Sequence, residues 1–266
     1  MSRIEKVFSD LKEQNKKALV TFVTAGDPDH QTSDDIVKQL SKSGADIIEL
    51  GMPFSDPMAD GPSIQRANIR ALNSGATLIK TLQIVKSFRV IDASTPIVLM
   101  GYFNPIHHYG TERFVTEAKE SGVDGLIIVD VPPEEDSELN EPMRKSGLDL
   151  IRLVTPTTDP ARLDLILNSA SGFLYYVSIA GVTGTKSADV QTVGSHITQI
   201  RQKTDMPIVV GFGIKTPDDA KTMSEVADGI VVGSALVDTI EKFENAEKSI
   251  TDLSEQVSAL ASAIQA

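Results

Sequence analysis

The chain alternates short apolar runs with longer amphipathic segments along its whole length. Eight of the runs are rich in β-branched residues and almost continuously apolar, as is typical of parallel strands that are covered on both faces. They begin near residues 18, 46, 96, 125, 149, 173, 207 and 229. Eight rounds of strand and helix in a chain of this length predict a closed (β/α)8 barrel, an α/β fold that forms a single domain over residues 1–266.

The segments between the runs have the periodicity and the capping residues of helices. Segments 33–44 and 111–122 each carry an apolar stripe and end in a glycine, and segment 159–172 follows the same design. We expect Thr111 to be the N-cap of the second helix and Asp159 the N-cap of the third.

Extra helices are expected outside this alternation: at the N-terminus, over residues 63–75 after the second strand, and after the eighth strand. Near the C-terminus, apolar residues recur at spacings of three and four, which fits a helix packed on the barrel or a coiled-coil seam. Two heptads are few for a coiled coil, so packing is favoured. The residues concerned are Ile250, Leu253, Val257, Leu260 and Ile264.

Composition excludes several classes of function. The chain has 25 basic and 37 acidic residues and a net charge of −12, which argues against nucleic acid or an anionic membrane as a partner. It has no cysteine, its four histidines lack a metal-binding spacing, and no apolar run reaches the length of a membrane span. The N-terminal segment lacks the apolar core of a signal peptide, so we expect a cytoplasmic protein without a metal.

The stretch "DIIELGMPFSDPMADGPSIQRAN" (46–68) ends an apolar strand in a carboxylate, Glu49. Strand alternation puts Glu49 on one side with Ile47 and Gly51, facing either the barrel interior or the outer helices. A strand Glu is commonly paired with a base, but no basic residue lies between Lys42 and Arg66. An unpaired carboxyl among apolar side chains has a raised pKa, which suits a general acid or base near neutral pH.

The loop that follows carries two more carboxylates, Asp56 and Asp60. Pro53, Pro57 and Pro62 restrict its backbone. Aspartate is a common turn residue, so a capping role for one of the two stays open. A loop this stiff also suits a catalytic group that must be held in position.

Glycine-containing turns follow the last two strands, in "GFGIKTPDD" (211–219) and "VVGSALVDTI" (231–240). In barrels of this class, backbone N–H groups and a helix N-terminus at these loops bind phosphate. We therefore expect a phosphate site around Gly213, Gly233 and Ser234. Backbone amides there would allow a protein of negative net charge to bind an anionic substrate. Glycines used only for close packing are the alternative reading.

Five motifs in this order, "ELGMPFSDPMADGPSIQRAN", "DVPPEE", "GVTG", "GFGI" and "VVGSALV", closely resemble the tryptophan synthase alpha chain family over about residues 15–245. The resemblance implies a lyase that splits indole-3-glycerol phosphate into indole and glyceraldehyde 3-phosphate by a retro-aldol reaction. It also implies a beta-chain partner in an alpha2-beta2 heterotetramer that passes indole on to L-tryptophan synthesis. Pyridoxal phosphate is then expected only in the beta chain, and this chain needs no cofactor.

The resemblance also implies roles for individual residues. Glu49 does the acid/base work, and Asp60 accepts a hydrogen bond from the indole N1–H. The indole pocket or its lid is expected to include Phe22, Tyr102, Tyr175, Thr183 and Phe212, and the phosphate site Gly184, Gly213, Gly233 and Ser234. The partner would dock at Pro53, Asp56 and Pro57.

One segment departs from the family pattern. Relatives commonly read S-R-x-G-V-T-G in the loop after the sixth strand, whereas this chain has Ile179 and Ala180 in "SIAGVTG". We therefore expect this loop to be held closed by different contacts than in those relatives. Two rival functions also remain at this point: a different sugar-phosphate isomerase or aldolase, and a catalytically weak subunit that mainly activates its partner.

Overall fold

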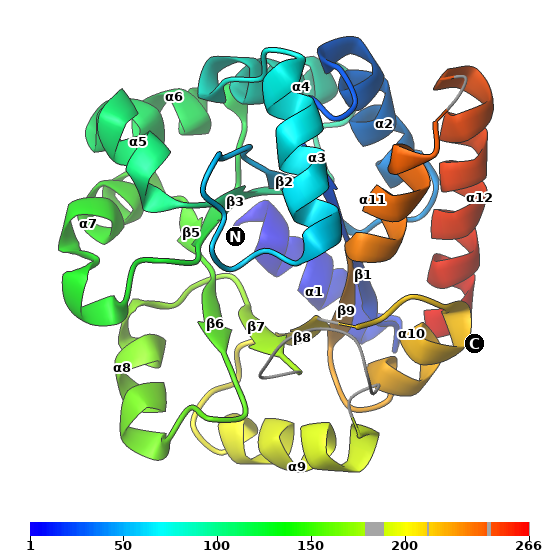
Figure 1. The fold of residues 1–266 in the computed structure, drawn as a ribbon. Coiled ribbons are helices and arrows are strands. Elements are labelled where there is room, and N and C mark those ends of the chain that lie inside the picture. Colours follow the sequence, from blue (N-terminus) through cyan, green and yellow to red (C-terminus); the bar gives the residue numbers. More distant parts are fainter. Residues whose placement is uncertain (179–188, 212, 244–245, 266) are drawn as a thin grey trace.

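The computed structural model describes residues 1–178, 189–211, 213–243 and 246–265. Within these ranges, nine parallel strands form one sheet in the order β5-β4-β3-β2-β1-β9-β8-β7-β6. The strands are β1 (Ala18–Thr24), β2 (Ile47–Gly51), β3 (Ile97–Gly101), β4 (Gly125–Ile128), β5 (Asp149–Leu150), β6 (Arg152–Val154), β7 (Leu174–Val177), β8 (Ile208–Gly211) and β9 (Gly229–Val232). The two ends of this order, β5 and β6, are consecutive in the chain, so the sheet closes into the predicted barrel (Figure 1).

The fifth predicted strand is divided between two partners. Its first part, β5, pairs with β4, and its second part, β6, pairs with β7. Ile151 lies at the change of partner, and its N–H still donates to the carbonyl of Leu126. The eight predicted strands are thus all present, and the barrel closes through a strand that divides its hydrogen bonds between two neighbours.

Helices surround the barrel and cover its ends (Figure 1). Their bounds are α1 (Arg3–Glu13), α2 (His30–Lys42), α3 (Pro62–Asn73), α4 (Leu78–Ile91), α5 (Phe103–Tyr109), α6 (Thr111–Ser121), α7 (Ser137–Ser146), α8 (Pro160–Ser169), α9 (Val190–Arg201), α10 (Pro217–Ser224), α11 (Ser234–Glu241) and α12 (Ala246–Ile264), with a 3-10 turn η1 (Pro133–Glu135). The extra helices predicted at the N-terminus and after the second and eighth strands are α1, α3 and α11. The short helix α5 and the turn η1 were not predicted.

Capping agrees with the sequence at two of three positions. Asp159 caps α8 by accepting a hydrogen bond from the N–H of Arg162 at 2.8 Å, and Gly122 ends α6 with φ +93°. The predicted N-cap Thr111 is wrong, because Gly110 occupies the cap and Thr111 is the first helical residue. The Thr111 hydroxyl instead donates to Glu138 on α7 at 2.9 Å.

Two apolar layers follow from strand alternation. The outer layer lies between strands and helices, and the inner layer fills the barrel. The inner layer includes Val20, Phe22, Ile47, Val98, Ile127, Ile151, Tyr175, Val209 and Val231. Residue 49 has the same parity on β2 as Ile47, so the Glu49 side chain lies inside the barrel.

Helix α1 closes the barrel at the end where the strands begin, within the ring of strands in Figure 1. Phe8 packs on Phe173 of the inner layer, with ring centroids 5.8 Å apart. Arg3 contacts Asp124 at 2.8 Å, just before β4. The opposite end, where the strands finish, is the end at which barrels of this class carry their functional loops.

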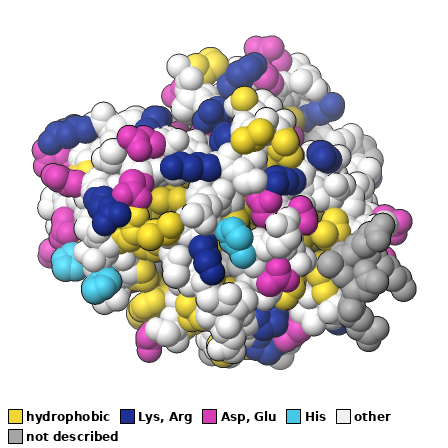
Figure 2. All heavy atoms as spheres, turned by 90° about the horizontal axis from the view of Figure 1, so that it is seen from above, with side chains coloured by type: hydrophobic (Ala, Val, Ile, Leu, Met, Phe, Trp, Pro, Cys, Tyr) yellow, Lys and Arg dark blue, Asp and Glu magenta, His cyan; other side chains and the backbone are white. Residues whose placement is uncertain are grey.

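The C-terminal helix α12 packs against α2, α10 and α11, as the apolar spacing predicted. Its side chains Leu253, Val257, Leu260 and Ile264 are buried in the outer layer. None of the helices in the described ranges is long and apolar enough to cross a membrane. Figure 2 shows basic and acidic side chains interspersed on one face of the molecule.

Candidate active site

The central group is Glu49, whose side chain is completely buried inside the barrel. It lies between Phe22 of β1 and Val98 of β3 in the strand register. Neither carboxyl oxygen has a hydrogen-bond partner among the described residues. Burial without compensation raises the pKa of Glu49 from its ordinary 4.5 to about 8. At neutral pH the side chain is therefore mainly a neutral acid that can donate a proton.

A small pocket lies at the finishing ends of β2, β3 and β4, and Gly51 in its wall follows Glu49 by two residues on the same face of β2. Its wall combines apolar side chains with a carboxylate and an amide from the loop after β2 and from α3. The lining residues are Phe22, Gly51, Met52, Asp60, Ile64, Asn68, Met100, Gly101, Tyr102 and Val129. The cavity measures about 10 Å3, room for a single water, so it is the chemistry of its walls, apolar with one carboxylate acceptor, that matches a flat apolar ring with one hydrogen-bond donor.

Asp60 is the charged group of the pocket wall. The Asn68 amide donates to its Oδ2 at 2.9 Å, and the Tyr102 hydroxyl also hydrogen-bonds to it. Burial raises the pKa of Asp60 and outweighs both of these hydrogen bonds, which lower it. The Tyr102 hydroxyl accepts from the N–H of Ala59 at 2.9 Å, which ties the loop to β3.

Two strand glycines give aromatic rings the space to lie over Glu49. A Cβ at Gly51 would lie 2.7 Å from Cζ of Phe22, and one at Gly211 would lie 2.2 Å from the Tyr175 hydroxyl. Tyr175 is buried in the inner layer, and desolvation together with the nearby Glu49 raises its pKa well above the ordinary value. Phe22 and Tyr175 thus form the apolar surroundings that keep Glu49 protonated.

The predicted phosphate site lies at the ends of the neighbouring strands β8 and β9. Gly213 follows β8 with φ +85°, a conformation that other residues rarely adopt. Gly233 is the N-cap of α11, which begins at Ser234, and no side chain in the described part of the chain caps this helix. A Cβ at Gly233 would lie 3.3 Å from Cβ of Phe22. The first turn of α11 therefore borders the pocket that Phe22 lines.

The loop from Pro53 to Asp60 presents an exposed edge beside the pocket. Asp56 is exposed and accepts from the Ser55 hydroxyl at 2.6 Å, while Pro53 and Pro57 are half-buried. Met58 is 85% exposed, an unusual state for a large apolar side chain. Three of the predicted substrate residues, Thr183, Gly184 and Phe212, lie outside the described residues, as do Ile179 and Ala180.

Sequence reasoning missed Asn68 and Gln65, which both bind Asp60. The Gln65 side chain donates to the carbonyl of Asp60 at 2.8 Å, and Asn68 is itself buried. Asn68 lies one helical turn after Ile64, so the helical spacing places both on the inner side of α3. That spacing was the available signal.

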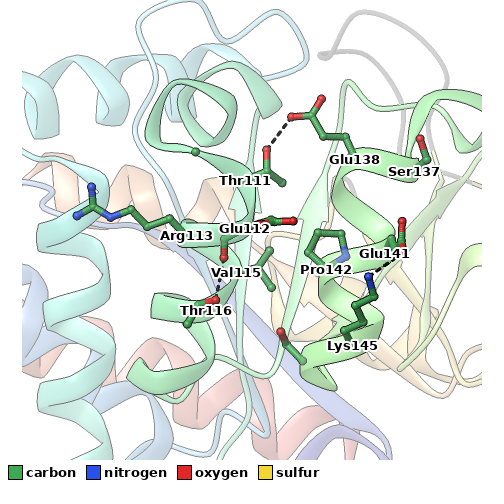
Figure 3. A pocket seen from close by; sticks show the side chains of 12 residues that line it. Thr111, Glu112, Arg113, Val115, Thr116, Ser137, Glu138, Glu141, Pro142 and Lys145 are labelled. Carbon is green, nitrogen blue, oxygen red and sulfur yellow. Dashed lines mark hydrogen bonds and ion pairs between the residues drawn. The ribbon is translucent and has the colours of Figure 1, made fainter.

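A larger groove, of about 710 Å3, lies between α6 and α7 on the outside of the barrel (Figure 3). Its walls carry Glu112, Glu138 and Glu141, and Lys145 pairs with Glu141 at 2.8 Å. It contains none of the predicted site residues. Among the described residues no group of three or more side chains could hold a metal ion.

A fully buried carboxyl group near a pocket, with a second carboxylate on the pocket wall and a helix N-terminus close by, is an arrangement typical of a barrel enzyme. The model of a protein family described as "Tryptophan synthase alpha chain" matches residues 8–265. The chain belongs to the tryptophan synthase alpha chain family. It is accordingly a lyase that cleaves indole-3-glycerol phosphate.

Solved structures resemble the whole chain. A tryptophan synthase subunit alpha from Legionella pneumophila is 42% identical with a TM-score of 0.92, and the match covers 99% of this chain and 98% of that one. A structure from Aquifex aeolicus is 38% identical with a TM-score of 0.91 and full coverage of both chains. A tryptophan synthase from M. tuberculosis in an aminoacrylate-bound form is 31% identical with a TM-score of 0.89, also with full coverage.

Proposed function

We propose that Glu49 transfers both protons of the cleavage and that Asp60 stabilises the charge between the two transfers. The observation that carries this proposal is the buried and uncompensated Glu49 carboxyl, whose pKa of about 8 keeps it protonated before reaction. A general acid with a pKa near the working pH is the most effective one.

The proposed steps balance in protons and electrons. Neutral Glu49 donates its proton to C3 of the indole ring, which becomes an indoleninium ion with positive charge shared by N1. Glu49, now a carboxylate, removes the proton of the hydroxyl on the adjacent side-chain carbon. The bond from C3 to that carbon breaks, its electron pair returns to the ring, and the carbon becomes the aldehyde.

Asp60 accepts the hydrogen bond from N1–H in this scheme. Its carboxylate stabilises the ring most when N1 carries positive charge, which is a contribution to the transition state rather than to binding. Asn68 holds Asp60 Oδ2 at 2.9 Å and so fixes the direction of the carboxylate. Phe22, Tyr102 and Tyr175 would surround the indole ring.

The phosphate group would meet the amides at Gly213, Gly233 and Ser234. The N-terminal end of α11 has no side-chain cap from the described residues, and it offers its first N–H groups and a positive partial charge. Ser234→Asp adds a negative charge at this position, so it should weaken phosphorylated ligands and leave the affinity for free indole unchanged. Equal losses for both ligands would place the phosphate elsewhere.

A single-turnover assay with indole-3-glycerol phosphate tests the role of Glu49. Glu49→Gln keeps the shape but cannot exchange a proton, so cleavage should fall by at least about 10²–10⁴-fold while the substrate still binds. Asp46→Asn is the matched control. Asp46 directly precedes β2 at the closed end of the barrel, and burial raises its pKa to about 6. Its oxygen accepts from the N–H of Leu19 at 2.8 Å, a bond that the amide oxygen of Asn can also accept.

Asp46→Asn should retain normal cleavage. If Glu49→Gln retains a tenth of normal turnover, or if both variants lose activity alike, the assignment of Glu49 is wrong. Asp60→Asn should lower turnover more than the affinity for an indole-bearing inhibitor, because the amide still accepts a hydrogen bond but carries no charge. Equal losses would limit Asp60 to positioning the substrate.

We further propose that the chain works with a beta chain that docks at Pro53, Asp56 and Pro57. The exposure of Asp56 and of the large apolar side chain of Met58 supports docking at this loop. The same stiff loop carries Asp60 at its far end, so a partner bound here could act on the active site. In this proposal the assembly is alpha2-beta2, and the beta chain holds pyridoxal phosphate while this chain uses no cofactor. The chain would act as one domain in the cytoplasm.

A further inference from the structure

We propose that Arg70 is a positioning residue that fixes helix α11, at the phosphate end of the substrate, to the same rigid unit as Asp60 at the indole end. This inference rests on the proposed roles of Asp60 and Ser234. Arg70 lies on α3, between the two ends, and touches neither end itself.

Arg70 binds two carboxylates from different elements. Its Nε and Nη2 contact the two oxygens of Asp27 at 2.7 and 2.8 Å, and its Nη1 contacts Glu241 at 3.0 Å. Asp27 follows β1 and its side chain is fully buried, while Glu241 is the last residue of α11. One guanidinium group therefore joins the barrel, α3 and α11.

Helix α3 also holds Asp60 in place. Asn68 and Gln65 of α3 donate to the side chain and to the carbonyl of Asp60, at 2.9 and 2.8 Å. Arg66 adds a second link to α11, with its Nε and Nη2 at 2.7 and 2.8 Å from the Glu241 carboxylate. Helices α3 and α11 lie side by side in Figure 1 and pack on each other.

The ion pairs of Arg66 and Arg70 differ in how firmly they hold a defined geometry. The pair of Arg66 and Glu241 is half-exposed, and exposed pairs add little to stability. The pair of Arg70 and Asp27 is bidentate and buried on the Asp27 side, so it holds a defined geometry. A lysine has one nitrogen and cannot span three oxygens on two carboxylates.

Helix α11 is also packed on its surroundings: Leu236, Val237 and Ile240 are buried, and the helix contacts β1, α3 and α12. Apolar packing is non-directional, whereas the hydrogen-bonded ion pair of Arg70 with Glu241 sets a defined geometry at the C-terminal end of this eight-residue helix. A ligand that contacts Asp60 and Ser234 at once gains from both contacts only if their separation matches its length. Disturbing Arg70 should therefore weaken linked ligands and spare each fragment.

The experiment measures three affinities for each variant: for indole, for inorganic phosphate, and for a non-cleavable indolylalkyl phosphate. In Arg70→Lys the linked ligand should bind about tenfold more weakly while each fragment stays within about twofold. The KM for indole-3-glycerol phosphate should rise by a similar factor. Glu241→Gln leaves the buried pair of Arg70 and Asp27 intact and should weaken binding of the linked ligand about threefold. This variant tests the inference even if Arg70→Lys does not fold.

Arg201→Lys is the control, because Arg201 Nη2 contacts both oxygens of Asp228 at 2.9 Å, just before β9 begins. It should change none of the affinities. If Arg70→Lys and Glu241→Gln weaken the fragments as much as the linked ligand, or change nothing, Arg70 is only structural and the inference is overturned. A separate measurement tests the proposed function itself. If Ser234→Asp, made in the otherwise unaltered protein, leaves the affinity for inorganic phosphate unchanged, the proposed phosphate site is wrong. The inference about Arg70 is then overturned as well, because it rests on the role of Ser234.

Discussion

The ionisation of Glu49 should be measurable as a loss of stability with rising pH that the variant Glu49→Gln lacks. Burial raises the pKa of Glu49 from 4.5 to about 8 in the folded protein. Between these values the unfolded chain has lost the proton and the folded protein keeps it. The folded state binds more protons, so the free energy of unfolding falls as pH rises through this window.

The magnitude follows from the width of the window. One bound proton changes the free energy of unfolding by roughly 1.4 kcal/mol per pH unit, so the full span corresponds to on the order of 5 kcal/mol. The stability contribution is complete below pH 4.5 and is lost as pH rises through about 8. Glutamine does not titrate, and the other ionisable groups cancel when the two proteins are compared.

Urea unfolding at about pH 5.5 and about pH 7.5 gives the comparison. The free energy of unfolding of the natural protein, less that of Glu49→Gln, should fall by about 3 kcal/mol between the two pH values. A constant offset is expected in addition, because a buried amide also lacks hydrogen-bond partners, but the offset does not vary with pH. If the difference between the two proteins is the same at both pH values, Glu49 is already ionised in the free protein and the reasoning is refuted.

Three further outcomes are expected. Gly51→Ala puts a Cβ 2.7 Å from the Phe22 ring, so the KM for indole-3-glycerol phosphate should rise about tenfold, and an unchanged KM would contradict the pocket geometry. Asp56→Ala should leave cleavage by the isolated chain nearly unchanged but reduce its activation by a beta chain; equal loss of both rates would exclude coupling through this loop. Leu260→Ala should lower the free energy of unfolding by about 2–5 kcal/mol, since Leu260 is fully buried, and a loss under about 1 kcal/mol would count against packing of α12.

Most of the fold was predictable because the barrel repeats one local pattern. Continuous apolar runs and glycine or aspartate caps mark the strands and helices without knowledge of their partners. The division of the fifth strand at Ile151 was not predictable, because the change of partner depends on how the sheet closes. Helix α5 was missed because Pro105 and Gly110 in "GYFNPIHHYG" are typical of a loop.

The sequence drew attention to Glu49 and Asp60, but it did not show how the two side chains are arranged or that Asn68 and Gln65 contact Asp60. Alternation along β2 left Glu49 facing either side, and only the closed sheet places it inside. The absence of a nearby base in the sequence pointed to an unpaired acid, but a base from a distant element could have reached it. Contacts such as Arg66 with Glu241 join residues far apart in the chain, and local patterns carry no information about them.

The closed floor of the barrel has a consequence for the isotopic fate of the protons. Helix α1 seals the strand beginnings with Phe8 against Phe173, so water can approach the buried Glu49 only from the end where the strands finish. A bound substrate occupies that side. In the proposed cycle, the proton that Glu49 takes from the substrate hydroxyl then stays on Glu49 until the products leave, so the carboxyl is reloaded by the substrate and not directly by bulk water. Each turnover would return the enzyme to its starting protonation state, and solvent hydrogen would enter the indole C3 position only through exchange between turnovers or at the substrate hydroxyl.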